Sequence, residues 1–412
     1  MYTTSLGDSA MTRRSISLRQ LFIIYLKIGL IGFGPTLAAE TKKYLVKELQ
    51  WINEEEFLNG LALAQLLPGA TYVSLTVYIG YRLRGIMGAM TSFLALLLLP
   101  FTLMVSLSYL YFTYGSMAAV GMLFKGVVVV VVGVVAHATV ELGKSVVTDL
   151  PGVVIVLASI GVLLYSGNVF VVLCLAAIAG IIFYCRQLQC QGSAFAANSS
   201  ELILHVKPTL ISIKWIFILA IVLVSIAYGV SAQNILLKLA GVFFRLGAFL
   251  FGGGFSMIPF IQNEVVVNYR WLTLDEFVVG IALGQVTPGP VLIMATFIGY
   301  KVAALNGAIA ATLGIFLPSL LLVVAIAEFH QKIRSIIWVR AALKGIAVSF
   351  TGMLLVFTFG LIRHSLIDLA SILFAAGIFG VLRFCKLDTI WVIIGGTLLY
   401  WLMAVTNIIV IH

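Results

Sequence analysis

The stretch Gly284-Gln285-Val286-Thr287-Pro288-Gly289-Pro290-Val291 decides how this chain folds, and Ala64-Gln65-Leu66-Leu67-Pro68-Gly69-Ala70-Thr71 is its earlier counterpart. Each stretch lies within a run apolar enough to be buried in a membrane. Each also breaks a helix, because proline removes a backbone donor and glycine relaxes the backbone. Hydrocarbon tolerates freed peptide groups only where protein or a water-lined cavity satisfies them. Two such breaks at matching positions therefore indicate the binding site of a transporter.

The composition is that of a helical membrane protein. The chain has 412 residues, of which 62% are hydrophobic and 10% are charged, and its mean hydropathy is +1.15. The apolar runs are continuous rather than alternating, which excludes a membrane β-barrel. We therefore expect an all-α polytopic membrane protein. The net charge of +10 is typical of basic cytoplasmic loops, and the expected location is the inner (plasma) membrane of the cell.

The N-terminus and the cysteines indicate neither processing nor metal binding. Arg13, Arg14 and Arg19 precede the first apolar run without a small-residue cleavage site, so we expect a cytoplasmic N-terminus and no cleaved signal peptide. The cysteines lack the paired spacing of a metal site and are interpreted as free thiols; they are Cys174, Cys185, Cys190 and Cys385.

The chain contains an internal duplication. Lys27 and Arg245 are 218 residues apart, and an ordered series of further matches keeps offsets of 218–220 residues: Gly34 with Gly252, Trp51 with Trp271, Gln65 with Gln285, Pro68-Gly69 with Pro288-Gly289, Gly88 with Gly307, and Lys125 with Lys344. We divide the chain into a cytoplasmic basic tail (1–17), membrane repeat 1 (18–186), a polar linker with an extra transmembrane helix near 209–230 (187–234), and membrane repeat 2 (235–412).

The repeats are predicted to be inverted relative to each other. Each holds an even number of apolar segments, so the extra segment 209–230 turns the second repeat upside down. Most basic helix ends agree with this placement; the exceptions are Arg270, Lys301 and Arg363. The expected architecture is two inverted repeats with broken helices at mid-membrane. Re-entrant hairpins and crossing helices both fit the breaks.

The breaks and the polar side chains beside them form the predicted anion site. Half-helices that start after a break present unpaired N–H groups and a positive dipole end. The competing interpretations are simple kinks, close packing at glycine, and cations that extend to the membrane surface. The predicted substrate-binding residues are Lys27, Gly34, Gln65, Pro68, Gly69, Lys125, Arg245, Gly252, Gly253, Gln285, Pro288, Gly289, Pro290 and Lys344.

Several charged residues need a partner if they are buried. A two-fold axis in the membrane plane is expected to bring Lys125 and Lys344 to one central cavity, where an oxyanion would balance them. Glu40 and Glu264 are candidates for carrying a coupling proton, with helix capping or a surface salt bridge as the alternative. His137 and Glu141 share a helix face, and we interpret them as a solvated cluster rather than a proton relay.

These motifs resemble the chromate ion transporter family in its long, two-repeat form. The second half carries the resemblance best, in Phe251-Gly252-Gly253-Gly254, Pro259, Glu264, Trp271, Gly284-Gln285-x-Thr287-Pro288-Gly289-Pro290 and Gly299. The first half departs from it: Gly32-Phe33-Gly34-Pro35 is one glycine short, and Pro68-Gly69-Ala70 lacks the second proline. The resemblance implies an anion transporter that exports chromate and confers resistance, with sulfate as a related substrate.

Two other functional classes compete with a secondary transporter. A membrane enzyme would need a nucleophile–base pair or a metal constellation, and the five histidines are scattered. An anion channel, or an importer of another small anion, is the nearer alternative. No Walker-type phosphate loop occurs, so transport would use an ion gradient or the membrane potential. We expect no cofactor, metal or nucleic acid; the expected partners are an inorganic oxyanion and membrane lipid, with proton coupling and a homodimer as candidates.

Overall fold

The computed structural model describes residues 16–34, 36–115, 117–196, 234–250, 254–326, 337–385 and 387–406. Gly252, Gly253, the segment 209–230 and nearly all of the basic tail lie outside these ranges. Within them the regular structure is helical, apart from one isolated β-bridge between Phe33 and Gly289. The predicted all-α class is confirmed.

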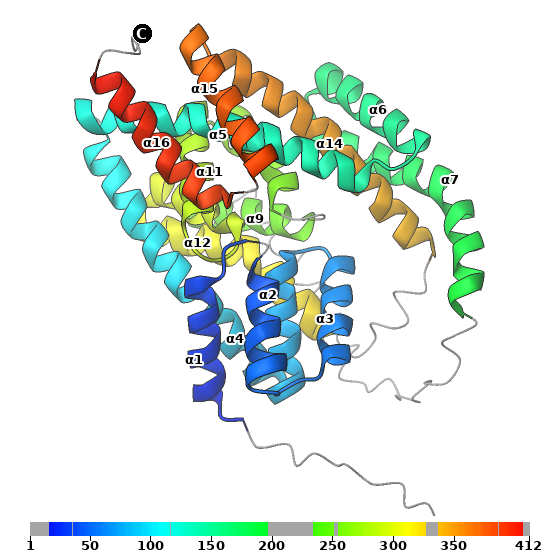
Figure 1. Cartoon of the computed structure of the whole chain (residues 1–412). Helices are drawn as coiled ribbons and strands as arrows, with labels where there is room; N and C mark the ends of the chain where they lie inside the picture. Colours follow the sequence, from blue (N-terminus) through cyan, green and yellow to red (C-terminus); the bar gives the residue numbers. More distant parts are fainter. Residues whose placement is uncertain are drawn as a thin grey trace, which may run out of the picture.

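The described elements follow the same order in both halves of the chain (Figure 1). The first half contains α1 (Leu18–Ile31), α2 (Thr36–Lys42), the π-helix η1 (Lys43–Glu48), α3 (Glu54–Leu66), α4 (Thr71–Tyr114), α5 (Ala118–Val146), α6 (Leu150–Ser166) and α7 (Val169–Ala196). The second contains α9 (Ile235–Ala248), η2 (Phe255–Met257), α10 (Ile258–Gln262), the π-helix η3 (Asn263–Asn268), α11 (Leu274–Val286), η4 (Val291–Ile293), α12 (Met294–Ile326), α14 (Ile337–Ser365), α15 (Leu369–Gly380), η5 (Val381–Cys385) and α16 (Thr389–Val405).

Four of the described helices are long and apolar enough to cross a membrane, namely Thr71–Tyr114, Gly121–Val146, Val291–Ala325 and Arg340–Ser365. The first and third of these are folded back on themselves. Arg84 and Gly85 leave helical geometry in α4, and Ala303 and Ala304 do so in α12. The two kinks fall at equivalent positions of the two repeats, so the duplication extends to the backbone.

Hydrogen bonds show that the chain reverses at each kink. The hydroxyl of Ser92 donates to the carbonyl of Thr76 at 3.2 Å, and Thr296 and Thr312 are joined through their hydroxyls at 2.7 Å. Residues sixteen apart in a straight helix would be separated by about 24 Å. We therefore describe a short arm and a long arm: 71–83 and 86–114 in α4, and 291–302 and 305–326 in η4–α12.

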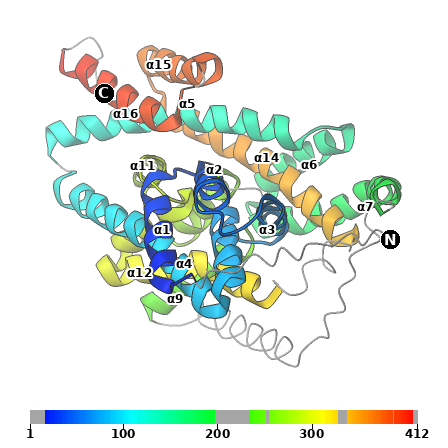
Figure 2. The same cartoon turned by 60° about the horizontal axis from the view of Figure 1, so that its bottom comes forward.

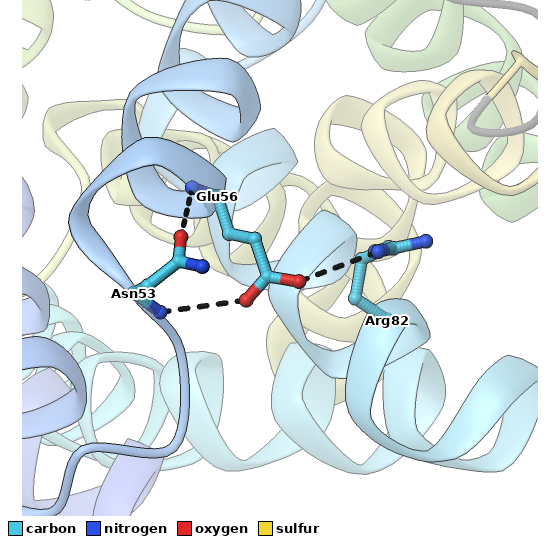
Figure 3. Close-up of polar contacts among 3 residues, drawn as sticks. All are labelled: Asn53, Glu56 and Arg82. Atoms are coloured by element: carbon cyan, nitrogen blue, oxygen red, sulfur yellow. Dashed lines mark hydrogen bonds and ion pairs between the residues drawn. The ribbon is translucent and has the colours of Figure 1, made fainter. Parts of the chain in front are cut away.

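The short arm of α4 packs antiparallel to α3 as a helical hairpin, named hairpin 1b. A Cβ on Gly60 would lie 2.6 Å from the ring of Tyr78, so glycine permits this close approach. At the open end Glu56 accepts a hydrogen bond from Arg82 at 3.3 Å, while Asn53 and Glu56 cap the start of α3 (Figure 3). Hairpin 2b, formed by α11 and the short arm of α12, closes in the same way.

The equivalent pair in hairpin 2b is Lys301 with Glu276, at 2.7 Å. The other broken segments are hairpins too. In hairpin 1a, α1 turns back into α2 and η1, which places the ammonium of Lys27 4.5 Å from the centre of the Tyr44 ring. In hairpin 2a, α9 turns back into 255–268, and Arg245 reaches Glu264. Of the two geometries compatible with the sequence, the structure has hairpins.

The remaining helices join the two halves. A buried run of valines makes α5 apolar all round between 127 and 135, as expected for a helix enclosed by others. It crosses α14 where the hydroxyls of Thr139 and Thr358, which are repeat-equivalent residues, lie 2.9 Å from each other. Each of the two helices packs against the last helices of the opposite half: α5 on α15 and α16, and α14 on α6 and α7 (Figure 2). The halves are thus interlocked.

Candidate functional site

The tips of the four hairpins meet through backbone hydrogen bonds. Gly289 in hairpin 2b donates its N–H to the carbonyl of Gly32 in hairpin 1a at 2.7 Å, and its carbonyl accepts from the N–H of Gly34 at 3.0 Å. Gly69 in hairpin 1b donates to the carbonyl of Leu250 in hairpin 2a at 2.9 Å. Gly32 and Leu250 occupy equivalent positions of the two repeats, and so do Gly69 and Gly289. The same bond is therefore made twice, each time between opposite halves.

Glycine is required at two of these tips. Gly69 has φ +131° and Gly289 has φ +104°, values that residues with a Cβ rarely adopt. A Cβ at Gly69 would lie 2.6 Å from the Ser319 hydroxyl, and one at Gly289 would lie 2.5 Å from Pro100. Pro100 and Ser319 belong to the long arms of α4 and α12. Each 1b or 2b tip is thus held against a long arm of the other half.

The second-half tip contains buried donors without a partner. Gln285 is 9% exposed and Thr287 is 3% exposed, and within the described part of the chain neither the amide nitrogen of Gln285 nor the hydroxyl of Thr287 has a hydrogen-bond partner. Unsatisfied buried polar groups are costly, at about 1–3 kcal/mol each, so native proteins retain few of them. Pro288 and Pro290 are buried in the same turn. This tip therefore offers unused donors to a ligand.

The first-half counterpart differs from what the sequence suggested. Gln65 is exposed, although its match to Gln285 led us to expect donation from the same face. Its helix α3 packs chiefly against α4, whereas α11 is enclosed by α5, α12 and α16. Pro68 is half-buried and Gly69 is buried. The tips thus lie together, but Gln65 is exposed whereas Gln285 is buried.

The cation and the carboxylate of hairpin 2a lie together. Arg245 donates to Glu264 at 2.8 Å, and Asn268 donates to the other oxygen of the same carboxylate at 3.3 Å. Glu264 is 3% exposed. In hairpin 1a the matching cation is Lys27, which lies over Tyr44 instead. Both cations are within about 8 Å of their tips along the helix axis.

Glu40, the other candidate for proton coupling, is not part of such a pair. Its carboxylate lies 4.0 Å from the ammonium of Lys43, and its side chain is 26% exposed. In the surface cluster on α5, Glu141 pairs with Lys144 at 3.6 Å and with Arg383 at 3.3 Å. This is the solvated arrangement that we expected for His137 and Glu141.

The structure does not bring Lys125 and Lys344 together, contrary to the expectation from the sequence. Lys125 precedes Thr139 on α5 by roughly 21 Å of helix, and Lys344 precedes Thr358 on α14 by the same length. The two lysines therefore lie on different helices of the crossed pair. Lys344 forms an ion pair in which its ammonium lies 3.2 Å from the carboxylate of Asp149. Lys125 lines a separate cavity of about 610 Å³, together with Lys301, Asp368 and Tyr400.

Asp149 was not among the residues that the sequence predicted to be functional, yet it connects the three helices α6, α7 and α14. It caps α6 through the N–H of Gly152, accepts from the hydroxyl of Tyr184 at 2.8 Å, and pairs with Lys344. Burial alone would raise the pKa of Asp149, but the hydrogen bonds from Tyr184, Gly152 and Lys344 hold that pKa below its usual value. Asp149 and Asp368 are equivalent positions of the two repeats, so the repeat pattern could have drawn attention to them.

Replacing Asp149 by asparagine is expected to destabilise the protein by about 1 kcal/mol or more, because the amide can still cap α6 but leaves Lys344 without a counter-charge. Thermal unfolding of the purified protein measures this. The matched control is Glu54→Gln, since Glu54 pairs with Lys42 at the exposed end of a hairpin and such pairs contribute about 0–1 kcal/mol. Equal melting temperatures for the two variants would contradict the structural role of Asp149.

Comparisons with known proteins agree with the duplicated architecture. The sequence profile of the chromate transporter family matches residues 19–181 and again residues 237–401. The chain is 31% identical to the chromate transport protein of Cupriavidus metallidurans over 409 residues, covering 96% of both proteins. It is 29% identical to the chromate transport protein of Pseudomonas aeruginosa, covering 94% of this chain and 93% of the relative.

An uncharacterised transporter of Methanocaldococcus jannaschii is 30% identical, with 87% of this chain and 88% of the relative covered. No solved structure matches the chain significantly. The two profile matches fall on the two halves that the hairpin tips join. The chain therefore belongs to the chromate transporter family, in the two-domain form that covers both halves.

Proposed function

We propose that this protein is a secondary active transporter of an inorganic oxyanion, with chromate export as its main activity and sulfate as a related substrate. The relatives named chromate transport proteins support the substrate class. The observation that carries the proposal is the reciprocal bonding of the hairpin tips, Gly289 to Gly32 and Gly69 to Leu250. Broken helices that meet in this way are the usual construction of a transporter's central site.

We further propose that the two halves are inverted repeats across the membrane. The long arm of α4 starts at the open end of hairpin 1b, where Gly88 packs on Gly80. It passes the tip of hairpin 2b at Pro100 and reaches the open end of hairpin 2b at Phe112, whose ring lies 4.9 Å from the ammonium of Lys301. From Gly88 to Phe112 the rise is about 36 Å, enough to cross a hydrocarbon core of ~30 Å.

The chemistry of the tips suits an oxyanion. The short arms of α4 and α12 begin at the tips, so their first N–H groups and positive dipole ends point toward the meeting point of the four hairpins. The free amide of Gln285 and the free hydroxyl of Thr287 add donors on one side. Arg245 and Lys27 provide positive charge nearby. The described residues of the tip supply backbone and side-chain donors and no carboxylate, which favours a fully ionised anion.

The membrane potential can drive export of such an anion. Moving one charge across a membrane is worth about 2.3 kcal/mol per 100 mV, so a dianion gains about twice that on leaving an inside-negative cell. We propose that the protein resides in the inner (plasma) membrane with the open ends of hairpins 1a and 1b facing the cytoplasm, in keeping with the basic residues around them.

Uptake into proteoliposomes tests this function. The purified protein should accumulate labelled chromate, and sulfate more weakly, when a potential of the correct sign is imposed, and the initial rate should saturate with concentration. Unlabelled anion trapped inside should accelerate uptake by exchange, which a channel does not show. Flux no greater than in protein-free liposomes would contradict transport, and a non-saturating flux without exchange would indicate a channel instead.

A further inference from the structure

The two equivalent hairpins 1a and 2a give their repeat-equivalent cations different partners. The π-helices begin at Lys43 and Asn263, which are equivalent positions of the two repeats, so Tyr44 corresponds to Glu264. Lys27 lies over the Tyr44 ring at 4.5 Å, whereas Arg245 binds the Glu264 carboxylate at 2.8 Å. The first half therefore pairs its cation with a neutral ring, and only the second half pairs it with a group that can take up a proton.

The surroundings of Arg245 leave it able to bind a second anion. Its guanidinium lies 4.9 Å from the centre of the Phe170 ring, which shields one face, and its Nε is buried and has no hydrogen-bond partner among the residues that the structure describes. The side chain is 32% exposed, whereas that of Glu264 is 4% exposed. Guanidinium groups bind oxyanions through two parallel N–H bonds. One edge of Arg245 is thus occupied by Glu264, and further donor capacity remains.

No other described charge competes for Glu264. Lys238, on the same helix as Arg245, lies over the Tyr269 ring. The charged side chains of the packed helices α5, α12 and α14 have other neighbours or are exposed: Lys301 with Glu276, Lys344 with Asp149, His364 with Asp275, Glu141 with Lys144 and Arg383, His137 beside Phe379, and Lys125, Arg340 and Arg363 exposed. On α7, Tyr184 is bonded to Asp149. A change in the charge of Glu264 therefore acts chiefly on its electrostatic interaction with Arg245.

We propose that Glu264 is the proton-binding group of this transporter and that it competes with the oxyanion for Arg245. While Glu264 is ionised, it holds the guanidinium. A proton taken from solvent onto the Glu264 carboxylate cancels that charge, and Arg245 then turns its N–H groups to the anion near the hairpin tips, about 8 Å along the helix. Loss of the proton returns Arg245 to Glu264 and expels the anion. The inference rests on the proposed function, because it concerns the same anion.

This arrangement moves one proton together with each anion, in the same direction. A dianion that leaves with one proton still carries one net negative charge outward, so an inside-negative potential continues to drive export. By linkage, an anion whose binding requires one proton should bind about tenfold more tightly for each unit of pH decrease while Glu264 of the free protein is ionised, and the gain should level off once that carboxylate is protonated.

Binding of sulfate to the purified full-length protein tests the proposal, since sulfate stays a dianion between about pH 5 and 8, the range in which a buried carboxylate titrates. Wild-type affinity should rise as the pH falls. The Glu264→Gln variant should bind with the affinity that the wild type reaches at low pH, and independently of pH. Glu54→Gln removes the carboxylate of the Lys42 pair, which is far from the tips, and should keep the wild-type profile.

Three results would overturn the proposal. They are an unchanged pH dependence in Glu264→Gln, loss of sulfate binding in a Glu264→Gln protein that is still folded, and no proton uptake when sulfate is added to weakly buffered wild type. The last measurement needs no variant, so it holds even if Glu264→Gln fails to fold. Wild-type protein that binds neither sulfate nor chromate at any pH would refute the proposed function itself.

Discussion

Replacing Gly289 by alanine is expected to slow anion transport at least about tenfold. Gly289 has φ +104°, and its N–H and carbonyl both bond to hairpin 1a. A Cβ there would lie 2.5 Å from the ring of Pro100. The strained backbone alone costs about 1–3 kcal/mol, and the clash must displace either the tip or the long arm of α4. Since about 1.4 kcal/mol is a factor of ten, we expect the uptake rate to fall at least about tenfold.

A matched control separates the tip from backbone strain in general. Gly167 also has positive φ, at +60°, but a Cβ there would meet nothing within 4 Å. Gly167→Ala therefore has strain without a clash, in the turn between α6 and α7, and should transport normally. Gly69→Ala should resemble Gly289→Ala, because its Cβ would lie 2.6 Å from the Ser319 hydroxyl. Normal uptake by well-inserted Gly289→Ala protein would show that the tip contact is dispensable.

The duplication could be predicted from the sequence because it depends on local residues. Breaks at Pro68-Gly69 and Pro288-Gly289 are properties of proline and glycine themselves, and the constant offset between them survives divergence elsewhere. The same offset relates features that only the structure shows, such as the Arg84 and Ala303 kinks and the Thr139–Thr358 contact. Local chemistry and periodicity were sufficient to predict the Pro-Gly breaks and the duplication, but not these further features.

Side-chain partners could not be predicted in this way, because they depend on which helices become neighbours. Lys344 was expected beside Lys125, but the exchange of helices between the halves places it against Asp149 of the first half. Gln65 and Gln285 have the same sequence context, yet α11 is enclosed by other helices and α3 is not. The Arg245–Glu264 pair requires hairpin 2a to turn back, which the break alone leaves open.

Cysteine labelling at the two kinks should place the halves on opposite sides of the membrane. Arg84 and Ala304 are exposed and lie at the open ends of hairpins 1b and 2b. The long arm of α4 separates those ends by about 36 Å. In a protein whose four cysteines are replaced by serine, a membrane-impermeant maleimide applied to intact cells should label Ala304→Cys strongly and leave Arg84→Cys unlabelled until the membrane is opened.

The labelling result is close to all-or-none, because an impermeant reagent does not cross the bilayer during the experiment. Met87→Cys provides an internal check, since Met87 is 66% exposed and lies just beyond Arg84 in the chain, so it should follow Arg84 rather than Ala304. Labelling of Arg84→Cys and Ala304→Cys from the same side would refute the inverted repeats. The reciprocal tip bonds would then relate the two halves by a two-fold axis along the membrane normal, as in transporters built from parallel repeats.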